Sequence, residues 1–355
     1  MDSWLPWAAV SYRTLVAAAS ARDQSVGAQR PAAGGRDDQP DRPSVRLQAR
    51  GLLAQSELAG AGITDPQLCA SYRACRRLNA AHGRTYFLAT RLLPEGKRPY
   101  VHALYGFARY ADEIVDDLGS GLTPAEKTLR LDAWAGRFLA GRTDDPVLPA
   151  VLDTIRRWDI PLEHFQAFLT SMRMDLTVRE YATWDDLMTY VYGSGAVIGL
   201  QMLPILEPSH DAATPYARDL GTAFQLANFL RDVGEDLRRD RVYLPQESLA
   251  LFGVDREVLA GGVVDGRVRR LLAFEIARCR ELFRAAAPGV RLLHPTSRPC
   301  IQTALRLYAA ILDEIEKADY QVLDRRVRVG TARRLRVALP AYIRATRAGN
   351  AAVSQ

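Results

Sequence analysis

Apolar residues recur at three- and four-residue spacing from about Leu58 onward, as they do in helices that bury one face. Val101, Leu104 and Ala108 form one such set. Prolines interrupt the pattern where helices are expected to begin or end, at Pro94, Pro124, Pro146, Pro161, Pro204, Pro215, Pro245, Pro288 and Pro299. No segment alternates as a strand does, and no repeat of fixed period is present. The pattern predicts an all-α domain of about ten helices between residues 63 and 346.

The first sixty residues lack this periodicity. From Ser20 to about Arg50 the chain is rich in Ala, Arg, Asp, Gly, Pro and Gln, and it cannot bury enough apolar surface to offset the entropy of ordering. No charged segment precedes an apolar one at the start of the chain, so a secretory signal is not expected. We predict a disordered extension over residues 1–60, one folded domain over residues 61–346 and a flexible tail over residues 347–355.

Composition only slightly narrows the possible folds and partners of the protein. The chain has 355 residues, 48% of them hydrophobic and 25% charged, which suits one large core. A net charge of +6 indicates anionic partners such as phosphates or an acidic membrane surface, without selecting between them. The four cysteines lack metal-ligand spacing and are expected to be free thiols in a reducing cytosol. The longest apolar run, residues 195–206, is too short to span a membrane.

Acidic residues are concentrated in the segment YADEIVDD, residues 110–117. Asp112 and Asp116 are four positions apart and share one face of the predicted helix. Like charges at this spacing destabilise a helix by only about 0.2–0.5 kcal/mol. A solvated acidic face would therefore explain this motif on its own.

The same arrangement recurs in LANFLRDVGEDLRRDRVYLP, residues 226–245. Asp232 and Asp236 are again four apart, and Asn228 lies one turn earlier. Two such helices facing each other would bring several carboxylates together, and their mutual repulsion would be unfavourable unless a hard cation neutralised it. Mg²⁺ is usually held by a few carboxylates and substrate phosphates. Arginines flank both motifs, at Arg109, Arg231, Arg238, Arg239 and Arg241. The two motifs predict a metal–diphosphate site, the alternative being two unrelated acidic faces.

Three glycines, Gly193, Gly195 and Gly199, interrupt an apolar helical segment, YVYGSGAVIGLQM. Each glycine costs a helix about 1 kcal/mol relative to alanine. Close packing against another helix would explain them. A smooth wall for a long hydrocarbon would also explain them, with Tyr190 and Tyr192 at its mouth.

Four blocks of the chain together resemble the squalene/phytoene synthase family, and they are most similar to its bacterial phytoene synthases. They are HGRTYFLATRLLP (82–94), ALYGFARYADEIVDD (103–117), YVYGSGAVIGL (190–200) and YARDLGTAFQLANFLRDVGEDLRRDRVYLP (216–245). The resemblance implies an isoprenoid synthase fold, in which one helical domain surrounds a central active-site cavity. It also implies a prenyltransferase that joins two geranylgeranyl diphosphates head to head. The product is phytoene, formed through prephytoene diphosphate with release of two diphosphates.

The resemblance assigns metal and phosphate ligands by position. It implies that Asp112 and Asp116 bind Mg²⁺ (or Mn²⁺), as do Asp232 and Asp236, with Asn228 and Gln225 beside them. It implies diphosphate contacts for Arg109, Arg231 and Arg241. His82, Arg84 and Thr85 match the block that holds the second diphosphate, although Gly83 and Thr85 stand where serines are common.

Three tyrosines also match family positions. Tyr105 matches a residue at the ionisation site, Tyr190 one that assists proton loss or steers carbocations, and Tyr308 a later residue of the cavity. Aromatic faces stabilise cations, which is consistent with such roles. Core packing is the alternative for each.

Other functions are compatible with these motifs. A squalene-type enzyme would join two farnesyl diphosphates to presqualene diphosphate and then to squalene, with NADPH, or to dehydrosqualene. A terpene cyclase would carry DDxxD and a different second motif. A catalytically inactive family member serving as an assembly factor would be expected to have lost some of the four aspartates.

The expected partners are prenyl diphosphates, a membrane surface and downstream carotenoid enzymes, and no nucleic acid. The C-terminal segment DRRVRVGTARRLRVALPAYIRATR would place Leu335, Ala338, Leu339 and Tyr342 on one side of a helix. Arginines near anionic lipid contribute about 1 kcal/mol each. We therefore expect a cytoplasmic protein that associates peripherally with the cytoplasmic face of the membrane.

Overall fold

The computed structural model describes residues 54–117 and 121–353, and for Arg84 and residues 343–353 it describes the backbone alone. Helices dominate and no strand forms among these residues, where two isolated bridges, Glu180–Val242 and Pro208–Leu293, are the extended pairings present. The all-α prediction is confirmed.

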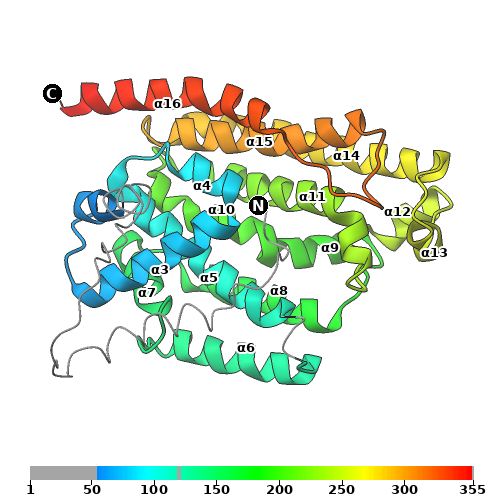
Figure 1. The fold of residues 1–355 in the computed structure, drawn as a ribbon, viewed down its shortest axis with the longest axis horizontal. Coiled ribbons are helices and arrows are strands. Elements are labelled where there is room, and N and C mark those ends of the chain that lie inside the picture. Colours follow the sequence, from blue (N-terminus) through cyan, green and yellow to red (C-terminus); the bar gives the residue numbers. More distant parts are fainter. Residues whose placement is uncertain (1–53, 118–120, 354–355) are drawn as a thin grey trace, which may run out of the picture.

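The helices follow one another with short connections (Figure 1). After a helical turn over residues 54–60, they are α3 (Pro66–His82), α4 (Arg84–Thr90), α5 (Arg98–Asp116), α6 (Pro124–Leu139), α7 (Leu148–Trp158), α8 (Leu162–Thr177), α9 (Trp184–Val191), α10 (Val197–Met202), α11 (Ala213–Leu237), α12 (Gln246–Leu251), α13 (Arg256–Ala260), α14 (Gly266–Ala286), α15 (Arg298–Lys317) and α16 (Thr331–Val353). Shorter turns are η1 (Glu95–Lys97), the π turn η3 (Tyr192–Ala196), η4 (Pro204–Leu206) and η5 (Ala287–Leu292).

Helix starts follow local chemistry. The side chain of Asp65 accepts a hydrogen bond from the backbone N–H of Leu68 and caps α3. Thr123 with Glu126, and Thr183 with Asp186, form reciprocal capping boxes at α6 and α9. Prolines occupy the first turn of several helices, including α3, α5, α6, α7 and α15. Those of α6 and α15, Pro124 and Pro299, were among the prolines that the sequence analysis placed at helix ends.

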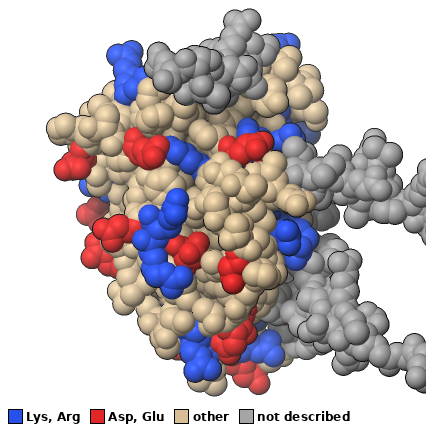
Figure 2. Space-filling view, turned by 90° about the vertical axis from the view of Figure 1, so that its left-hand side faces the viewer, with Lys and Arg blue, Asp and Glu red and all other residues tan. Residues whose placement is uncertain are grey.

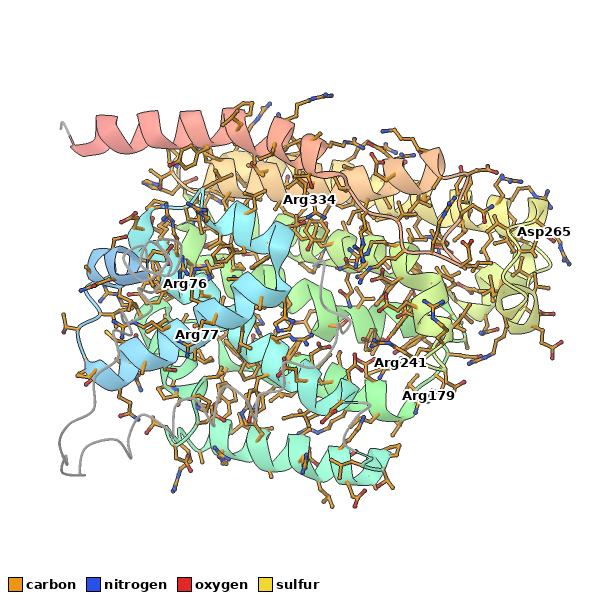
Figure 3. The ribbon with its side chains drawn as sticks, in the orientation of Figure 1. Arg76, Arg77, Arg179, Arg241, Asp265 and Arg334 are labelled. Carbon is orange, nitrogen blue, oxygen red and sulfur yellow. The ribbon has the colours of Figure 1, made fainter. Side chains whose placement is uncertain are left out.

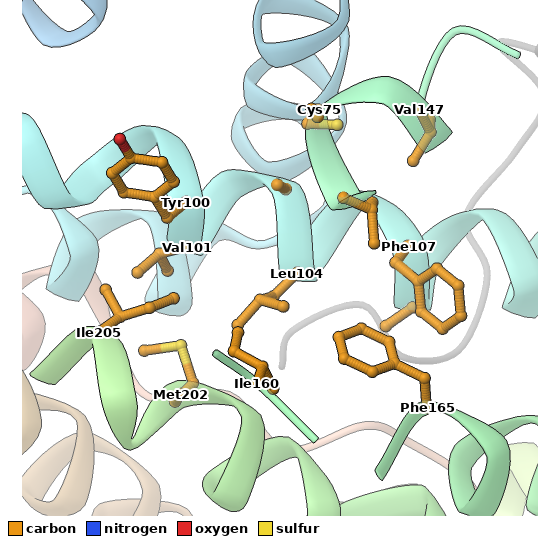
Figure 4. Packing of buried hydrophobic residues seen from close by; sticks show 14 of the residues in the cluster. Cys75, Tyr100, Val101, Leu104, Phe107, Val147, Ile160, Phe165, Met202 and Ile205 are labelled. Carbon is orange, nitrogen blue, oxygen red and sulfur yellow. The ribbon is translucent and has the colours of Figure 1, made fainter. Parts of the chain in front are cut away.

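Two apolar clusters form the core. One joins α3, α5, α6, α7 and α8, and in it the ring of Phe107 lies 5.1 Å from that of Phe165 (Figure 4). The rings of Trp134 and Phe138 lie 5.0 and 4.8 Å from that of Phe107. The other joins α9, α11, α14 and α15. Helix α11 runs through the middle, packed against α14, α15, α10 and η3, while α16 and α6 lie along opposite edges in Figure 1. All four cysteines are buried and free, as expected.

The ends of the folded domain differ from the prediction. Residues 54–60, assigned to the disordered extension, form a helical turn in which Glu57 and Leu58 are buried. The compositional bias ends near residue 50, and the apolar periodicity begins sooner after it than expected. Residues 347–353, assigned to a flexible tail, continue α16. The predictions for residues 1–53 and 354–355 lie outside the described residues.

One continuous helical stretch, Trp184–Leu206, is long and apolar enough to cross a membrane by length and composition alone. The shorter run noted in the sequence is its second half, so the expectation that no segment reaches this length is wrong. Within its apolar window, 72% of the stretch is buried inside the protein, as in a core helix.

On the face shown in Figure 2, acidic and basic side chains are interspersed and do not form separate patches of one sign.

Candidate active site

The aspartates of both motifs lie in the interior. Asp112 and Asp116, near the end of α5, are 7% and 9% exposed, and Asp232 and Asp236, near the end of α11, are 1% and 2% exposed. These values exclude the solvated-face explanation, because a solvated face would leave its carboxylates in water.

Four helices and the segment after α11 enclose a polar pocket, which we call the acidic pocket. Its lining includes seven residues that the sequence assigned to the site: Asp112, Asp116, Tyr190, Gln225, Asn228, Asp232 and Arg241. Asp236 lines a small adjoining pocket together with Arg241 and Tyr243. Tyr308 lines neither, since its buried ring stacks on Phe224 at 4.1 Å and supports that residue from behind.

Arginines hold the first aspartate pair. Arg109 donates to Asp112 at 2.7 Å and to Glu113 at 3.1 Å. Arg239 and Arg241 donate to the two oxygens of Asp116 at 2.9 and 3.2 Å. The two motifs are thus joined directly, because Arg239 and Arg241 follow the second motif and bind the first.

In the second pair, Arg231 donates through two nitrogens to Asp232 at 2.7 and 2.6 Å. Arg326, which the sequence analysis did not assign, donates to the same carboxylate at 2.9 Å. Arg326 lies between α15 and α16, and Gly234 lets that segment approach: a Cβ at residue 234 would lie 1.9 Å from the carbonyl oxygen of Leu323.

Asp236 differs from its neighbours, because neither of its carboxylate oxygens accepts a hydrogen bond from the residues that the structure describes. Burial, and then the charge of Asp232, raise its pKa well above the usual range. Burial and the charge of Asp116 likewise raise the pKa of Asp112. A nearby positive charge would lower the pKa of both carboxyl groups by stabilising their ionised forms.

A divalent metal fits these donors. Within the described part of the chain no three His, Cys, Asp or Glu side chains form a closed metal cage. The oxygen ligands come instead as open pairs on two helices, which suits a hard cation that shares its coordination with phosphate. The arrangement fits Mg²⁺ better than a soft metal, which would favour sulfur ligands.

Asp175, at the end of α8, is a site residue that the sequence analysis missed. Its carboxylate is buried and accepts hydrogen bonds from the hydroxyls of Tyr190 at 2.9 Å and Tyr243 at 2.8 Å. Burial, with a contribution from Asp116, raises the pKa of Asp175 to about 6. The ring of Tyr243 also stacks on that of Phe229 at 4.1 Å. A lone acid has no spacing signal, whereas Tyr243 stands in the recognised YLP segment and could have been assigned.

The early block lies beside these residues without lining the acidic pocket. His82 ends α3 half-buried, and burial together with Arg109 lowers its pKa to about 4. Arg84 begins α4, and Thr85 follows it, buried. Tyr105 is buried, its ring 5.9 Å from that of Tyr86.

Gly83 has a steric explanation where family members often have serine. A Cβ at residue 83 would lie 2.5 Å from Oδ1 of Asn79 and 2.9 Å from the ring of Tyr105. No side chain fits between these neighbours without a shift, so this departure follows from the packing of α3 against α5.

A second, apolar cavity opens beyond the acidic pocket and contains about 860 Å³ of space, including space open to solvent. Its walls come from α4, α10, α11, α15 and η5, and nearly all of them are apolar. Ser194 lines both this cavity and the acidic pocket, so the two are adjacent. An amphiphile with an anionic head and a long hydrocarbon chain matches this pair.

The glycines serve both purposes that the sequence left open. A Cβ at Gly199 would lie 2.1 Å from the carbonyl oxygen of Ala217, and one at Gly193 would lie 2.2 Å from Oγ of Ser171. Close helix packing therefore requires them. Gly195, Gly199 and Gly221 also line the apolar cavity, so its wall has no side chain at these points.

Comparison with known proteins gives the same answer as the site. The family model of squalene/phytoene synthase matches residues 79–333. The chain belongs to the squalene/phytoene synthase family. Members of this prenyltransferase family that resemble it include a phytoene synthase of Arthrospira platensis, 38% identical over 291 residues, which cover 78% of this chain and 93% of that one. A 15-cis-phytoene synthase of Synechococcus elongatus is 37% identical over 79% of this chain and 94% of its own.

Solved structures of the squalene/phytoene synthase family share the fold. A dehydrosqualene synthase superposes with a TM-score of 0.70 at 26% identity, over 76% of this chain and 95% of that one. A squalene synthase from Alicyclobacillus acidocaldarius gives 0.66 at 26% identity, over 74% and 98% of the two chains. The fold is therefore that of the isoprenoid synthases, as predicted.

Proposed function

We propose that this protein is a phytoene synthase. It condenses two geranylgeranyl diphosphates head to head, through prephytoene diphosphate, and releases two diphosphates. The relatives at 37–38% identity that carry this name support the assignment. The observation that carries it in this chain is the depth of the apolar cavity below the acidic pocket.

The length of α11 between the two ends of the cavity gives that depth. It carries Gln225 at the acidic pocket and Ala213 at the far end of the cavity, where Leu206 and Leu293 also line the wall. Twelve residue positions of α-helix span about 18 Å. At about 1.2 Å per bond of an extended chain, the main chain of a geranylgeranyl group spans about 18 Å and that of a farnesyl group about 13 Å. The depth suits the longer chain.

Hydrogen bonds and an ion pair stabilise the far end of the cavity. The backbone N–H of His294 donates to the carbonyls of Leu206 and Glu207 at 3.2 and 2.9 Å, and that of Ser209 donates to Leu292 at 2.7 Å. Behind this seam, Lys97 bonds to Ser297 at 3.0 Å and forms an ion pair with Glu207. These contacts support a cavity of fixed length.

Mg²⁺, with Mn²⁺ as the alternative, is the proposed cofactor, and the oxygens of Asp112, Asp116, Asn228, Asp232 and Asp236 would hold it. When bound, it supplies charge neutralisation and Lewis acidity toward the diphosphate oxygens. Arg109, Arg231 and Arg241, now engaged with aspartates, are within reach of the same phosphates. Their planar guanidinium groups suit bidentate binding.

The remaining assigned residues have supporting parts. His82, Arg84 and Thr85 are proposed to hold the second diphosphate, with Tyr105 beside them. Tyr190, Tyr243 and Phe229 present aromatic faces that stabilise cations near the ionisation site. The Tyr190 hydroxyl, which donates a hydrogen bond to Asp175, would receive or pass a proton. The apolar walls exclude the water that would quench a carbocation.

The squalene-type alternative has an observation in its favour, since the two structural neighbours described above carry squalene and dehydrosqualene synthase names. The assembly-factor alternative is not favoured, because all four aspartates are present and buried. Supplying the purified protein with farnesyl or geranylgeranyl diphosphate, with Mg²⁺ and with or without NADPH, separates the three. We expect a C40 hydrocarbon from geranylgeranyl diphosphate. A C30 product made in preference would indicate the squalene-type enzyme, and no product an assembly factor.

We also propose that α16 docks on the cytoplasmic face of the membrane, where the apolar product can pass to downstream enzymes. Leu335, Leu339 and Tyr342 are 57%, 60% and 48% exposed on one side of this helix. Ala338, expected with them, is instead buried against the protein together with Ala341. Exposed apolar residues beside Arg336 suit an anionic lipid surface.

Liposome flotation tests this docking. Binding should rise with anionic lipid content, fall with salt, and weaken in the double variant Leu335→Ser, Leu339→Ser. Leu129→Ser, which removes a leucine of α6 that is still more exposed, at 69%, should leave binding unchanged. Equal binding of the α16 variant and the parent would contradict the proposal.

A further inference from the structure

A third pocket lies directly behind the acidic pocket, where the end of α5, the start of α6, the end of α8 and the turn after α11 meet. Its charged lining consists of four cations, Lys127, Arg179, Arg239 and Arg241, and two carboxylates, Asp116 and Asp175. It contains about 490 Å³ of space, including space open to solvent. We call it the basic chamber.

The basic chamber shares a wall with the acidic pocket. Asp116, Asp175 and Arg241 line both. The guanidinium of Arg241 spans this wall, donating to the carboxylate of Asp116 at 3.2 Å and to the backbone carbonyl of Asp175 at 3.0 Å. An anion held beside the aspartates is therefore separated from the chamber by one layer of side chains.

The other two cations, the buried Lys127 and the more exposed Arg179, donate hydrogen bonds to backbone carbonyls. Lys127 donates to the carbonyl of Val115 at 2.9 Å. Arg179 donates to the carbonyls of Asp175 and Leu176 at 3.3 and 3.4 Å, and its carboxylate contact, Asp240, is 3.7 Å away at the surface. Such contacts are ordinary at helix C-termini.

Helix capping does not explain why both side chains line one pocket with two further arginines. Four of the six charged side chains that line the chamber are cations, while the further acids that contact them, Glu235 beside Arg239 and Asp240 beside Arg179, do not line it. Diphosphate carries several negative charges and many acceptor oxygens, and Arg and Lys are the side chains that bind it best. The chamber thus has the composition of a diphosphate site.

The exposure of the cations increases outward. The side chains of Arg241, Arg239 and Arg179 are 8%, 13% and 37% exposed, respectively. Figure 3 shows Arg241 and Arg179 close together at the same end of the molecule. The three arginines form a graded path from the aspartates to solvent, and Lys127, 8% exposed, lies in the interior.

We propose that the basic chamber binds diphosphate after it has left the prenyl chain and conducts it to solvent. The inference rests on the proposed function, which requires two diphosphates to depart while the hydrocarbon intermediate stays in the cavity. An anion that remained beside the allylic cation would recombine with it. Removal through the chamber keeps the anion on the side opposite the apolar cavity. No covalent bond changes in this step.

Inhibition by inorganic diphosphate in the presence of Mg²⁺ tests the proposal. In the double variant Lys127→Met, Arg179→Met, we expect the inhibition constant of diphosphate to rise about tenfold, equivalent to about 1.4 kcal/mol. The KM of the prenyl diphosphate should change several times less, because the substrate is held on the other side of the wall. Lys127→Arg, which keeps the charge, should retain the parental inhibition constant.

Arg130→Met, an exposed arginine on the same helix as Lys127, serves as the matched control and should behave like the parent. A parallel rise of KM and the inhibition constant would overturn the proposal, because the chamber would then belong to substrate binding. An unchanged inhibition constant would overturn it as well. If the parent itself forms no C40 product, the proposed function fails first, and that result is visible before any variant is made.

Discussion

Glu57 and Asp236 are equally buried, at 2% exposure each, yet among the described residues only Glu57 has hydrogen-bond donors. The carboxylate of Glu57 accepts a hydrogen bond from Arg76 at 2.6 Å and lies within 4 Å of Arg98 and His102. Burial alone would raise its pKa, but His102 and Arg76 lower it to about 2. Asp236 faces Asp232 and has no donor among the described residues, and its pKa is raised.

The contrast separates charge that stabilises the fold from charge that is kept for a ligand. A buried acid with complementary partners is complete without any addition. A buried acid that lacks donors raises the free energy of the folded state until something positive binds. The Glu57 cluster thus joins the turn over residues 54–60 to α3 and α5, whereas the aspartates provide a site at the expense of stability.

Apolar regions show the same contrast. Around Phe107 the aromatic rings of four neighbours fill the space, with centroids 4.8–5.8 Å away. Along α11, by comparison, small residues such as Ala213, Ala217 and Gly221 leave the cavity wall open. Filling the first region is a stability requirement, while the second is kept hollow for the substrate chain.

Asp236→Asn should produce the largest effect. Turnover should fall about a thousandfold, because a ligand that neutralises diphosphate charge is lost. The melting temperature, measured with a chelator present, should stay equal or rise, because a buried carboxylate without donors is removed. Asp219→Asn, on the same helix but paired with the exposed Arg218, should leave both nearly unchanged. Near-parental turnover of Asp236→Asn would contradict the metal-ligand role.

Glu57→Gln should show the reverse, a loss of about 2–3 kcal/mol in the free energy of unfolding at neutral pH. The folded pKa of Glu57 is about 2 against a usual 4.5, so its contribution is full above pH 4.5 and is lost as the pH falls toward 2. Burial lowers the pKa of His102, which makes low pH unfavourable in the same direction. Denaturant unfolding between pH 7 and pH 3 measures both.

In the Glu57→Gln variant, the free energy of unfolding should fall less steeply as the pH is lowered, because the contribution of Glu57 is missing. Glu95→Gln is the matched control, since Glu95 also lies 3.6 Å from Arg98 but is 47% exposed. Glu95→Gln should leave the dependence of the free energy of unfolding on pH unchanged. Equal acid slopes in the parent and Glu57→Gln would show that the cluster contributes nothing to stability.

Ala217→Phe should change specificity more than stability. Ala217 lies one turn closer to the acidic pocket than Ala213, so a phenyl ring there would shorten the cavity from about 18 Å to about 12 Å. We expect the ratio of kcat/KM for farnesyl over geranylgeranyl diphosphate to rise about tenfold to a hundredfold. Thr214→Phe, exposed on the same helix, should leave the ratio unchanged. An unchanged ratio in Ala217→Phe would show that the cavity does not measure chain length.

The sequence predicted the fold and most of the acidic pocket because both depend on spacing. Helical periodicity marks α5 and α11, and paired aspartates one turn apart mark the faces that meet. Asp175 and Arg326 were missed because each is a single residue whose partner is distant in the chain. Tyr308 was assigned to the cavity because it matches a family position, but its ring stacks on Phe224 and does not line the cavity. The buried turn at Glu57 was missed because its partners lie on α3 and α5.

Tyr190→Phe should have the smallest effect, about tenfold in turnover. It removes one of the two hydroxyls that donate to Asp175, while Tyr243 keeps the other. An unsatisfied buried carboxylate costs about 1–3 kcal/mol, so the double variant Tyr190→Phe, Tyr243→Phe should lose more than the product of the single effects. Single-turnover rates for the four proteins of this cycle measure the coupling. Independent effects would mean that the two hydroxyls do not act through a shared carboxylate. A coupling of 1 kcal/mol or more would instead place the Asp175 carboxylate, which the aspartate motifs do not include, within the group of charges that function requires.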